Sequence, residues 1–268
     1  MQEKYEKIIC ERKGKNNEVL WVTLNDEKMM NAMTNKMQQE LLDLLTNIAF
    51  DNSIRCVVFT GAGEKAFSSG GDISFFQTLD HVSTYDFLYA RGKTIQYHLE
   101  NMEKPIIAAV NGYCFAGGME LALSCDFIYA TENAKFGLLE INLGLLAGWG
   151  GTVRLPRKIP VNKAKEMIYR GEIITAAEAY QWGLVNRVLP NKEELYKEVD
   201  KVVTEMMAKP PLALRAAKNV INNSIACDSM EAALAIERGA VTWLFHSEDV
   251  KEGVAAFLEK RKPNFKGK

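Results

Sequence analysis

Pro105-Ile106-Ile107-Ala108-Ala109-Val110 is a short apolar run rich in β-branched residues, and Asn111-Gly112 follows it directly. A run of this length that ends in a turn dipeptide is typical of a buried strand. Shortly afterwards, Ala116-Gly117-Gly118-Met119-Glu120 opens a segment of good helix formers that continues to Cys125. The stretch Lys104–Glu140 therefore predicts a buried strand, a turn and a helix that begins at two glycines.

The glycine pair has two interpretations. Backbone N–H groups in the first turn of a helix have no partner inside the helix, and the helix dipole adds partial positive charge there. Such a terminus can hold an oxygen that develops negative charge, and glycine lets a ligand approach the backbone closely. Alternatively, the glycines only allow tight helix packing, since an isolated Gly-Gly is weak evidence for a site.

Two carboxylates lie in almost wholly apolar segments. Glu120 follows the glycine pair, and Glu140 lies in Phe136-Gly137-Leu138-Leu139-Glu140-Ile141 with no basic neighbour after Lys135. Glutamate is almost never fully buried unless it is paired or used, and burial raises the pKa of a carboxyl group toward neutrality. The pair is therefore a candidate for acid–base work, with a distant Arg or Lys partner for each as the alternative.

The same residues resemble a known family, the crotonase or enoyl-CoA hydratase/isomerase superfamily. The similar segments are Lys65-Ala66-Phe67-Ser68-Ser69-Gly70-Gly71-Asp72-Ile73, Ile107-Ala108-Ala109-Val110-Asn111-Gly112, Gly117-Gly118-Met119-Glu120, Cys125-Asp126, and Phe136-Gly137 through Glu140 to Gly144. The similarity extends from about Val22 to Glu259-Lys260-Arg261-Lys262-Pro263, nearly the whole chain. Because the family hosts several acyl-CoA reactions, the resemblance is more specific for the fold than for the reaction.

The resemblance implies an α/β fold, a crotonase-like ββα superhelical spiral, followed by C-terminal helices that form trimers or hexamers. The composition changes near Pro190, because strands alternate with helices before it and helices alone follow it. We therefore predict a spiral core with the CoA-thioester site over residues 1–190 and a helical oligomerisation region over residues 191–268.

The resemblance also implies the site. The N–H groups of Gly71 and Gly117 would form an oxyanion hole for the thioester carbonyl, each donor contributing roughly 3 kcal/mol. Glu120 would activate water as the base and Glu140 would protonate C2 as the acid. The substrate-binding residues would be Lys28, Ala32, Ser68, Ser69, Gly70, Gly71, Asp72, Ile73, Gly117, Trp149 and Lys260. For Asp72 the alternative is a helix cap, and for Lys260 an ordinary solvated lysine.

We therefore expect an enoyl-CoA hydratase, with a Δ3,Δ2-enoyl-CoA isomerase or another crotonase chemistry as the alternative. Coenzyme A enters as part of the substrate, and no metal or redox cofactor is implied. A non-enzyme alternative is an RNA-binding homologue that uses Lys158, Lys163 and Lys165, although so few lysines favour a solvated surface. The family usually has Pro where this chain has Ala147, and often a smaller residue where it has Trp149, so the acyl group stays open.

Composition excludes other classes of protein. The 268 residues are 47% hydrophobic with a formal net charge of -1, so no global attraction to nucleic acid or to a membrane surface is expected. The five cysteines form no CxxC pair, which argues against a disulfide framework or a zinc site. The charged segment Met1–Lys7 is unlike a secretory signal, and no apolar run has the roughly 18 residues of a membrane span. We expect a cytoplasmic protein.

Other segments predict the elements around the site. Ile8–Arg12 and Val19–Leu24 predict a β-hairpin, and Thr34 is expected to cap a helix. The glycine-rich segment Leu143–Thr152 predicts a tight turn into a short helix that ends near Pro156; it lacks the Gly-Lys-Ser/Thr of a phosphate loop. Thr175-Ala176-Ala177-Glu178 has the pattern of a capping box.

Overall fold

The computed structural model describes residues 5–268, with the side chain of Tyr89 left out. Residues 1–4, part of the charged N-terminal segment, lie outside the described residues. Within residues 5–268, no helix combines the length and the apolar character needed to cross a membrane.

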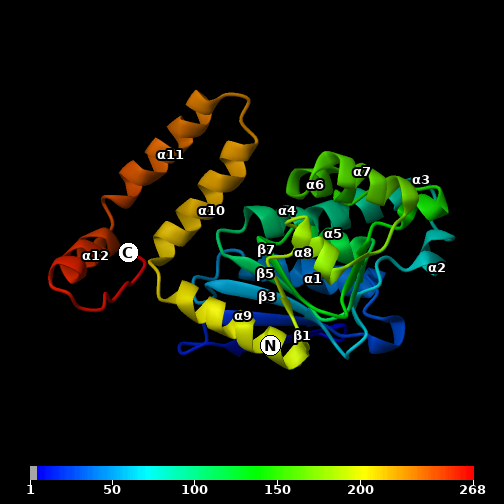
Figure 1. The fold of residues 1–268 in the computed structure, drawn as a ribbon, viewed down its shortest axis with the longest axis horizontal. Coiled ribbons are helices and arrows are strands. Elements are labelled where there is room, and N and C mark those ends of the chain that lie inside the picture. Colours follow the sequence, from blue (N-terminus) through cyan, green and yellow to red (C-terminus); the bar gives the residue numbers. More distant parts are fainter. Residues whose placement is uncertain (1–4) are drawn as a thin grey trace.

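The strands of the described residues form two mixed sheets (Figure 1). The six-stranded sheet has, in spatial order, β1 (Ile8–Lys13), β2 (Val19–Leu24), β3 (Cys56–Gly61), β5 (Ile106–Val110), β7 (Phe127–Thr131) and β10 (Arg187–Leu189). The four-stranded sheet has β4 (Ala66–Ser68), β6 (Tyr113–Phe115), β8 (Lys135–Gly137) and β9 (Ile174–Thr175). Pairing is antiparallel between β1 and β2 and between β8 and β9, and parallel elsewhere. The predicted hairpin and α/β fold are confirmed.

The helical segments follow the strands in a repeating order. Their bounds are η1 (Glu27–Met29), α1 (Asn35–Ile48), α2 (Ile73–Phe76), α3 (His81–Tyr85), η2 (Asp86–Lys93), α4 (Thr94–Asn101), α5 (Gly117–Leu123), η3 (Glu140–Leu143), α6 (Gly151–Lys158), α7 (Val161–Arg170), α8 (Ala176–Gln181), α9 (Lys192–Met207), α10 (Pro211–Ile225), α11 (Met230–Leu244) and α12 (Glu248–Leu258). η1 and η3 are 3-10 helices, and η2 is a π-helix.

The chain repeats a strand–strand–helix unit that advances through both sheets. The neighbouring strands β3, β5 and β7 of the larger sheet are followed by β4, β6 and β8, which are neighbours in the smaller sheet. A helical segment comes next in each unit. This is the predicted ββα spiral, and it places the carboxyl ends of β4, β6 and β8 side by side at one edge of the smaller sheet.

The turn between β5 and β6 explains the Asn-Gly dipeptide. The buried Asn111 side chain accepts a hydrogen bond from the Gly61 N–H at 3.0 Å and donates to the Gly63 carbonyl at 2.9 Å. A Cβ on Gly112 would overlap the Lys65 carbonyl. Asn111 thus links the turn between β5 and β6 to the segment between β3 and β4, and Gly112 permits the close approach of the two backbones.

Helix boundaries follow the residues that the sequence predicted for them. Thr34 accepts from the Met37 N–H at 3.3 Å, and Thr175 and Glu178 form the expected reciprocal capping box. The predicted short helix that ends near Pro156 is confirmed, since α6 ends at Lys158, two residues beyond the proline. A proline removes only one helical hydrogen bond, and the fully buried Leu155 beside it anchors the helix to the core.

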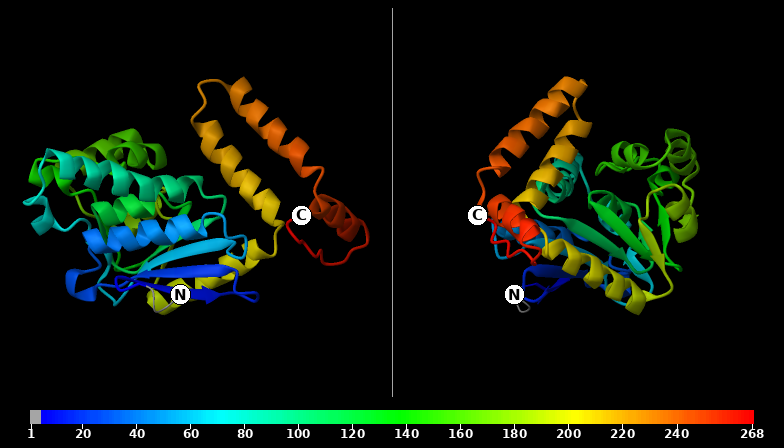
Figure 2. Two further views of the ribbon diagram at one scale, coloured as in Figure 1. Left: turned by 180° about the vertical axis from the view of Figure 1, so that it is seen from behind. Right: turned by 60° about the vertical axis from the view of Figure 1, so that its left-hand side comes forward.

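Beyond residue 190 the chain first covers the sheet and then leaves it. α9 packs on the larger sheet through Leu195, Val199 and Val203, which join Trp21 and Val58 in one apolar cluster. Residues 211–268, here called the C-terminal arm, extend away from the sheets as the helix pair α10 and α11, followed by α12 (Figures 1 and 2). The composition boundary at residue 190 stays a prediction, since α9 lies after it and packs on the core.

The arm is attached to the core by polar contacts of α10. The Lys218 ammonium group donates to the Leu99 and Lys104 carbonyls, both at 2.9 Å, and lies 3.1 Å from the Asp126 carboxylate. At the far end of the arm, the buried Asp249 carboxylate accepts from the N–H groups of Lys266 and Gly267. The C-terminal tail therefore folds back on the start of α12.

Candidate active site

Three loops converge where the parallel strands of the smaller sheet end. Gly71 follows β4, Gly117 follows β6, and Glu140 follows β8, each within three residues of the strand end. Because parallel strands present their carboxyl ends at one edge, residues far apart in the sequence become neighbours there. A Cβ on Gly117 would lie 3.6 Å from the backbone nitrogen of Gly71, so the two glycines lie next to each other.

Ala116 holds the start of α5 in an unusual backbone conformation. Its φ of 46° and ψ of -124° are rare for a residue with a side chain, which indicates local strain. The Ala116 N–H donates to the Gly137 carbonyl at 2.8 Å, and the Ala116 carbonyl accepts from the Glu120 N–H at 2.9 Å. These two hydrogen bonds hold the strained residue and thereby fix the position of the next residue, Gly117, the first residue of the helix.

The loop before α2 is fixed by the segment around η1. The Met33 N–H donates to the Gly70 carbonyl at 2.8 Å, and the Ser69 N–H donates to the Met30 carbonyl at 3.0 Å. The buried Ser68 hydroxyl accepts from the Gly70 N–H at 3.3 Å. The predicted substrate-binding residues Lys28 and Ala32 belong to this segment, Lys28 exposed and Ala32 buried.

Asp72 and Ile73 begin the next helix. The Asp72 carboxylate accepts from the Ser74 N–H at 3.0 Å and from the Ser74 hydroxyl at 2.6 Å, so it caps α2. Ile73 is exposed at the first position of that helix. The capping alternative for Asp72 is confirmed, and its role in substrate binding stays a prediction.

Glu120 and Glu140 interact inside the site. Glu120 is 2% exposed, and its Oε1 accepts from the Gly151 N–H at 2.8 Å. Burial, together with the negative charge of Glu140, raises the pKa of Glu120 to about 8, although hydrogen bonds from the Gly151 and Trp149 N–H groups oppose the shift. Burial also raises the pKa of Glu140, whose buried Oε2 has no hydrogen-bond partner among the described residues. No distant Arg or Lys forms an ion pair with either carboxylate in the described chain.

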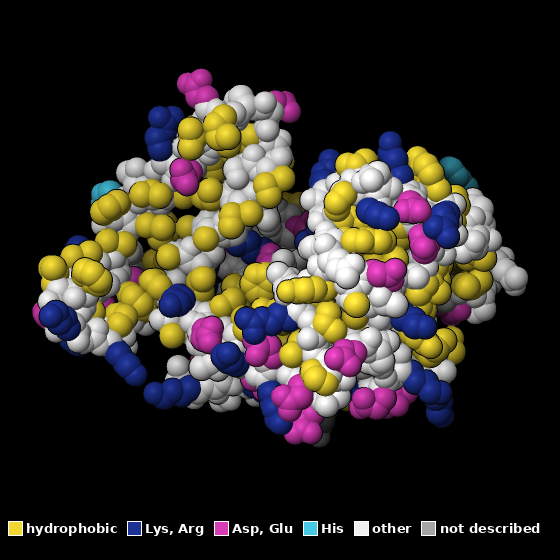
Figure 3. All heavy atoms as spheres, in the orientation of Figure 1, with side chains coloured by type: hydrophobic (Ala, Val, Ile, Leu, Met, Phe, Trp, Pro, Cys, Tyr) yellow, Lys and Arg dark blue, Asp and Glu magenta, His cyan; other side chains and the backbone are white. Residues whose placement is uncertain are grey.

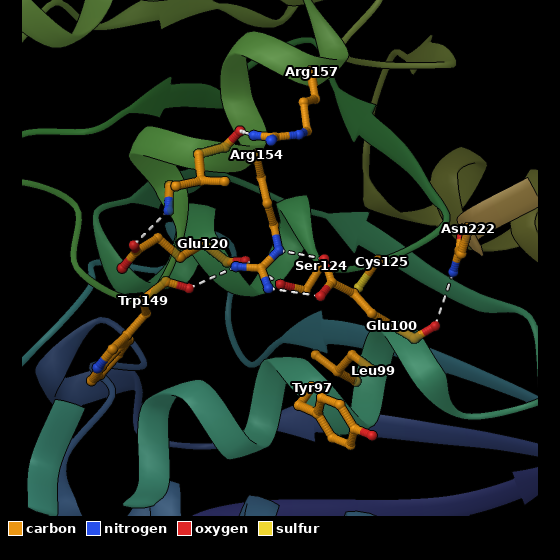
Figure 4. Close-up of polar contacts among 12 residues, drawn as sticks. Tyr97, Leu99, Glu100, Glu120, Ser124, Cys125, Trp149, Arg154, Arg157 and Asn222 are labelled. Carbon is orange, nitrogen blue, oxygen red and sulfur yellow. Dashed lines mark hydrogen bonds and ion pairs between the residues drawn. The ribbon is translucent and has the colours of Figure 1, made fainter. Parts of the chain in front are cut away.

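An ion pair supports the segment that holds Glu120. The Arg154 guanidinium donates to both carboxylate oxygens of Glu100, from Nε at 2.5 Å and from a terminal nitrogen at 2.8 Å (Figure 4). Its other terminal nitrogen donates to the Trp149 carbonyl at 2.7 Å. On the arm, the Asn222 amide donates to the Glu100 carbonyl at 2.9 Å. Hydrogen bonds thus extend from α10 through α4 and α6 to the loop behind Glu120.

Trp149 lies against the candidate oxyanion glycine, and Lys260 does not. A Cβ on Gly117 would lie 2.6 Å from Cζ3 of the Trp149 ring. Lys260 follows α12 at the end of the arm, whereas α2 lies at the opposite end of the molecule (Figure 1). Within one chain, Lys260 is therefore not part of this group of residues.

The sequence did not reveal the residues that support the site. Arg154 and Glu100 are 54 positions apart, and nothing in the sequence of either segment indicates the pairing. The glycine-rich segment did carry a signal for Gly151, because a Cβ there would lie 3.0 Å from Cγ of Glu120. Within the described part of the chain, no cluster of three or more His, Cys, Asp or Glu side chains could hold a metal ion.

The fold and the site together define a crotonase-type protein, an α/β spiral with two adjacent glycine amides and a pair of interacting carboxyl groups at one sheet edge. The model of the enoyl-CoA hydratase/isomerase family matches residues 14–268. The chain belongs to this family.

Individual relatives agree over almost the full length. The crotonyl-CoA hydratase of Syntrophomonas wolfei is 42% identical over 261 residues, 97% of this chain and 98% of the relative. The 2,3-dehydroadipyl-CoA hydratase of Escherichia coli is 41% identical over 254 residues, 93% and 96% of the two chains. A crystal structure of an enoyl-CoA hydratase from Bacillus anthracis has a TM-score of 0.93 at 36% identity, covering 98% of this chain and 100% of that one. The acyl groups in these names differ, so the family is shown more firmly than the substrate.

Proposed function

We propose that the protein is an enoyl-CoA hydratase, which adds water reversibly to a 2-enoyl-CoA and forms the 3-hydroxyacyl-CoA. The observation that supports this most is the pair of interacting carboxyl groups, the buried Glu120 and the half-buried Glu140, next to two adjacent glycine amides. Hydration needs one group to take a proton from water and another to deliver one to carbon, and two carboxyl groups supply both. An isomerase can work with one.

The reaction follows from these positions. The thioester carbonyl accepts hydrogen bonds from the N–H groups of Gly71 and Gly117, which stabilise the enolate oxygen by roughly 3 kcal/mol each. Glu120 takes a proton from water as the water oxygen bonds to C3 and the electrons of the double bond move into the enolate. Glu140 then delivers its proton to C2. Coenzyme A enters as part of the thioester.

The proton count of the pair explains reversibility. After hydration Glu120 holds the proton and Glu140 is ionised, which is the starting form for dehydration. Because the pKa of Glu120 is raised to about 8, the ligand-free pair holds one proton near neutral pH. We expect a bell-shaped pH profile for kcat/KM with its alkaline limb near pH 8, where the pair loses its last proton, and an acidic limb where the pair holds two protons and no base remains.

The decisive test is the loss of enoyl-thioester ultraviolet absorbance with crotonyl-CoA. Glu120→Gln and Glu140→Gln should each lower kcat on the order of a hundred- to ten-thousandfold and change KM much less. Glu132→Gln, at an exposed position on the chain, is the matched control. A variant of either site residue that retains most of its activity would contradict the proposal, and turnover of a 3-enoyl-CoA without hydration would favour the isomerase.

The lysine segment considered for RNA binding does not present a row of lysines. The Lys158 ammonium group donates to the Cys125 carbonyl at 3.3 Å, and Lys163 pairs with Glu166 at 3.2 Å. These contacts engage two of the three lysines and so disfavour the RNA-binding alternative.

We further propose a homo-oligomer, a trimer or a hexamer, built through the C-terminal arm. Large apolar side chains are exposed along the arm (Figure 3), namely Ile221, Ile225, Met230, Leu234, Val241, Trp243, Phe245, Val254, Phe257 and Leu258. A second copy of the chain would cover them. In such an assembly the arm of one copy can bring Lys260 to the CoA phosphates of another, together with Lys28. We also propose that the protein is cytoplasmic.

A further inference from the structure

Aromatic rings close the space beside both candidate oxyanion glycines. A Cβ on Gly71 would lie 2.8 Å from Cζ of Phe76, and a Cβ on Gly117 would lie 2.6 Å from Cζ3 of Trp149. Phe87 joins the two rings, with centroids 5.5 Å from Phe76 and 5.0 Å from Trp149. Phe75 packs on Phe87 from the same helix as Phe76, with a centroid distance of 5.6 Å.

Helix η2 is shaped to hold this group of rings. A Cβ on Gly92 would overlap the Trp149 indole, so the helix can approach the ring only because position 92 is a glycine. Trp149 is 7% exposed and Phe87 is 5% exposed. The buried indole nitrogen has no hydrogen-bond partner among the described residues, and it faces Gly92 of η2. The ring therefore contributes bulk rather than a polar contact.

We infer that Phe76, Phe87 and Trp149 form an aromatic wall that limits the substrate to 2-enoyl-CoA thioesters with short acyl chains. This inference rests on the proposed hydratase. The thioester carbonyl lies on Gly71 and Gly117, and C2 and C3 must reach the two carboxyl groups, so the following carbons extend along the rings beside the glycines.

The distances between the rings indicate whether the wall closes the acyl end of the site or leaves a slot for a flat acyl group. Ring centroids at 5.0 to 5.6 Å are those of aromatic side chains in direct contact. A slot for a flat or cyclic acyl group would need two rings held apart with room for a third between them. Phe87 contacts both Phe76 and Trp149, so an acyl chain that extends past the glycines meets packed rings, and a longer chain requires displacement of Trp149.

The wall can be tested without the reaction, by calorimetric titration with saturated butyryl-CoA and octanoyl-CoA. The wild-type protein should bind butyryl-CoA more tightly, whereas Trp149→Ala should shift the ratio of the two affinities toward octanoyl-CoA by about tenfold or more. Trp149→Phe should fall between them, and Phe76→Leu gives a milder opening should Trp149→Ala fail to fold. Phe50→Ala, at a position that is 93% exposed, is the control.

Hydration assays then separate this inference from the proposed function. With 2-enoyl-CoAs of four, six and eight carbons, kcat/KM should fall with chain length in the wild type and fall less in Trp149→Ala. Equal affinity for butyryl and octanoyl groups in the wild type, or an unchanged ratio in all the wall variants, would overturn the wall. If the protein binds the thioesters selectively but hydrates none of them, the aromatic wall is supported and the proposed hydratase activity is contradicted.

Discussion

The active site and the C-terminal arm depart from ordinary burial in opposite directions. At the site, polar atoms are buried without a partner among the described residues, Oε2 of Glu140 and Nε1 of Trp149. On the arm, apolar side chains are exposed, with Ile225 at 73% and Phe257 at 82%. Both arrangements cost stability in an isolated chain. The comparison supports the proposals that the site is adapted to a reacting thioester and the arm to another copy of the chain.

The largest expected effect tests the cost of the buried carboxyl group. Glu120→Gln should stabilise the protein while it lowers kcat, because the amide stays neutral when buried and cannot act as the base. Above pH 8 we expect a gain on the order of 3 to 5 kcal/mol in the free energy of unfolding, measured by chemical denaturation.

The sign of this effect depends on pH. The pKa of Glu120 is raised from 4.5 to about 8 by folding, so the unfolded chain loses the proton first as the pH rises. The wild type therefore loses stability between pH 4.5 and 8, by up to about 1.4 kcal/mol per pH unit, and the gain in Glu120→Gln grows over that window. Below pH 4.5 the two proteins should be alike. A gain that does not change with pH would show that burial does not raise the pKa of Glu120.

A smaller effect is expected on the arm. Phe257→Asp should weaken association between copies by roughly 2 kcal/mol, because an apolar contact is replaced by a charge. Sedimentation velocity at several concentrations should show smaller species than the wild type. Phe50→Asp, at an exposed phenylalanine outside the arm, should leave the assembly unchanged. If the wild-type protein sediments as a monomer, the proposal that another copy covers the arm is contradicted.

The smallest effect concerns the link between the two regions. Arg154→Gln breaks the ion pair with Glu100 and the hydrogen bond to the Trp149 carbonyl. We expect kcat to fall about tenfold with little change in KM, since Glu120 is held less firmly. The charge of Arg154 also lowers the pKa of Glu120, so its removal should move the alkaline limb of the pH profile to higher pH.

Arg157→Gln is the control for that variant. Arg157 is exposed on the same helix, and its guanidinium donates to the Val153 carbonyl within α6. If Arg154→Gln and Arg157→Gln behave alike in kcat and in pH dependence, Arg154 does not position Glu120 and the link is structural only.

Local patterns predicted what depends on neighbouring residues. The strand before Asn111-Gly112, the helix start at Gly117 and the capping box at Thr175 each follow from a few adjacent side chains. The burial of Glu120 was equally predictable, because apolar residues surround it on both sides in the sequence and carry it into the core with them. The convergence of Gly71, Gly117 and Glu140 came from the family resemblance, and the order of strands in the smaller sheet now accounts for it.

Contacts between distant segments were beyond such patterns. The pairing of Arg154 with Glu100 and the packing of Phe87 on Trp149 depend on where α4, η2 and α6 meet, which no local spacing encodes.

Residue 149 has two separate tasks, and the chain divides them between side chain and backbone. The indole shapes the acyl end of the site, whereas the N–H of the same residue, with that of Gly151, holds Glu120. Every amino acid except proline has a backbone N–H. During divergence, position 149 can therefore exchange one side chain for another, and with it one acyl group for another, while the catalytic machinery is inherited intact.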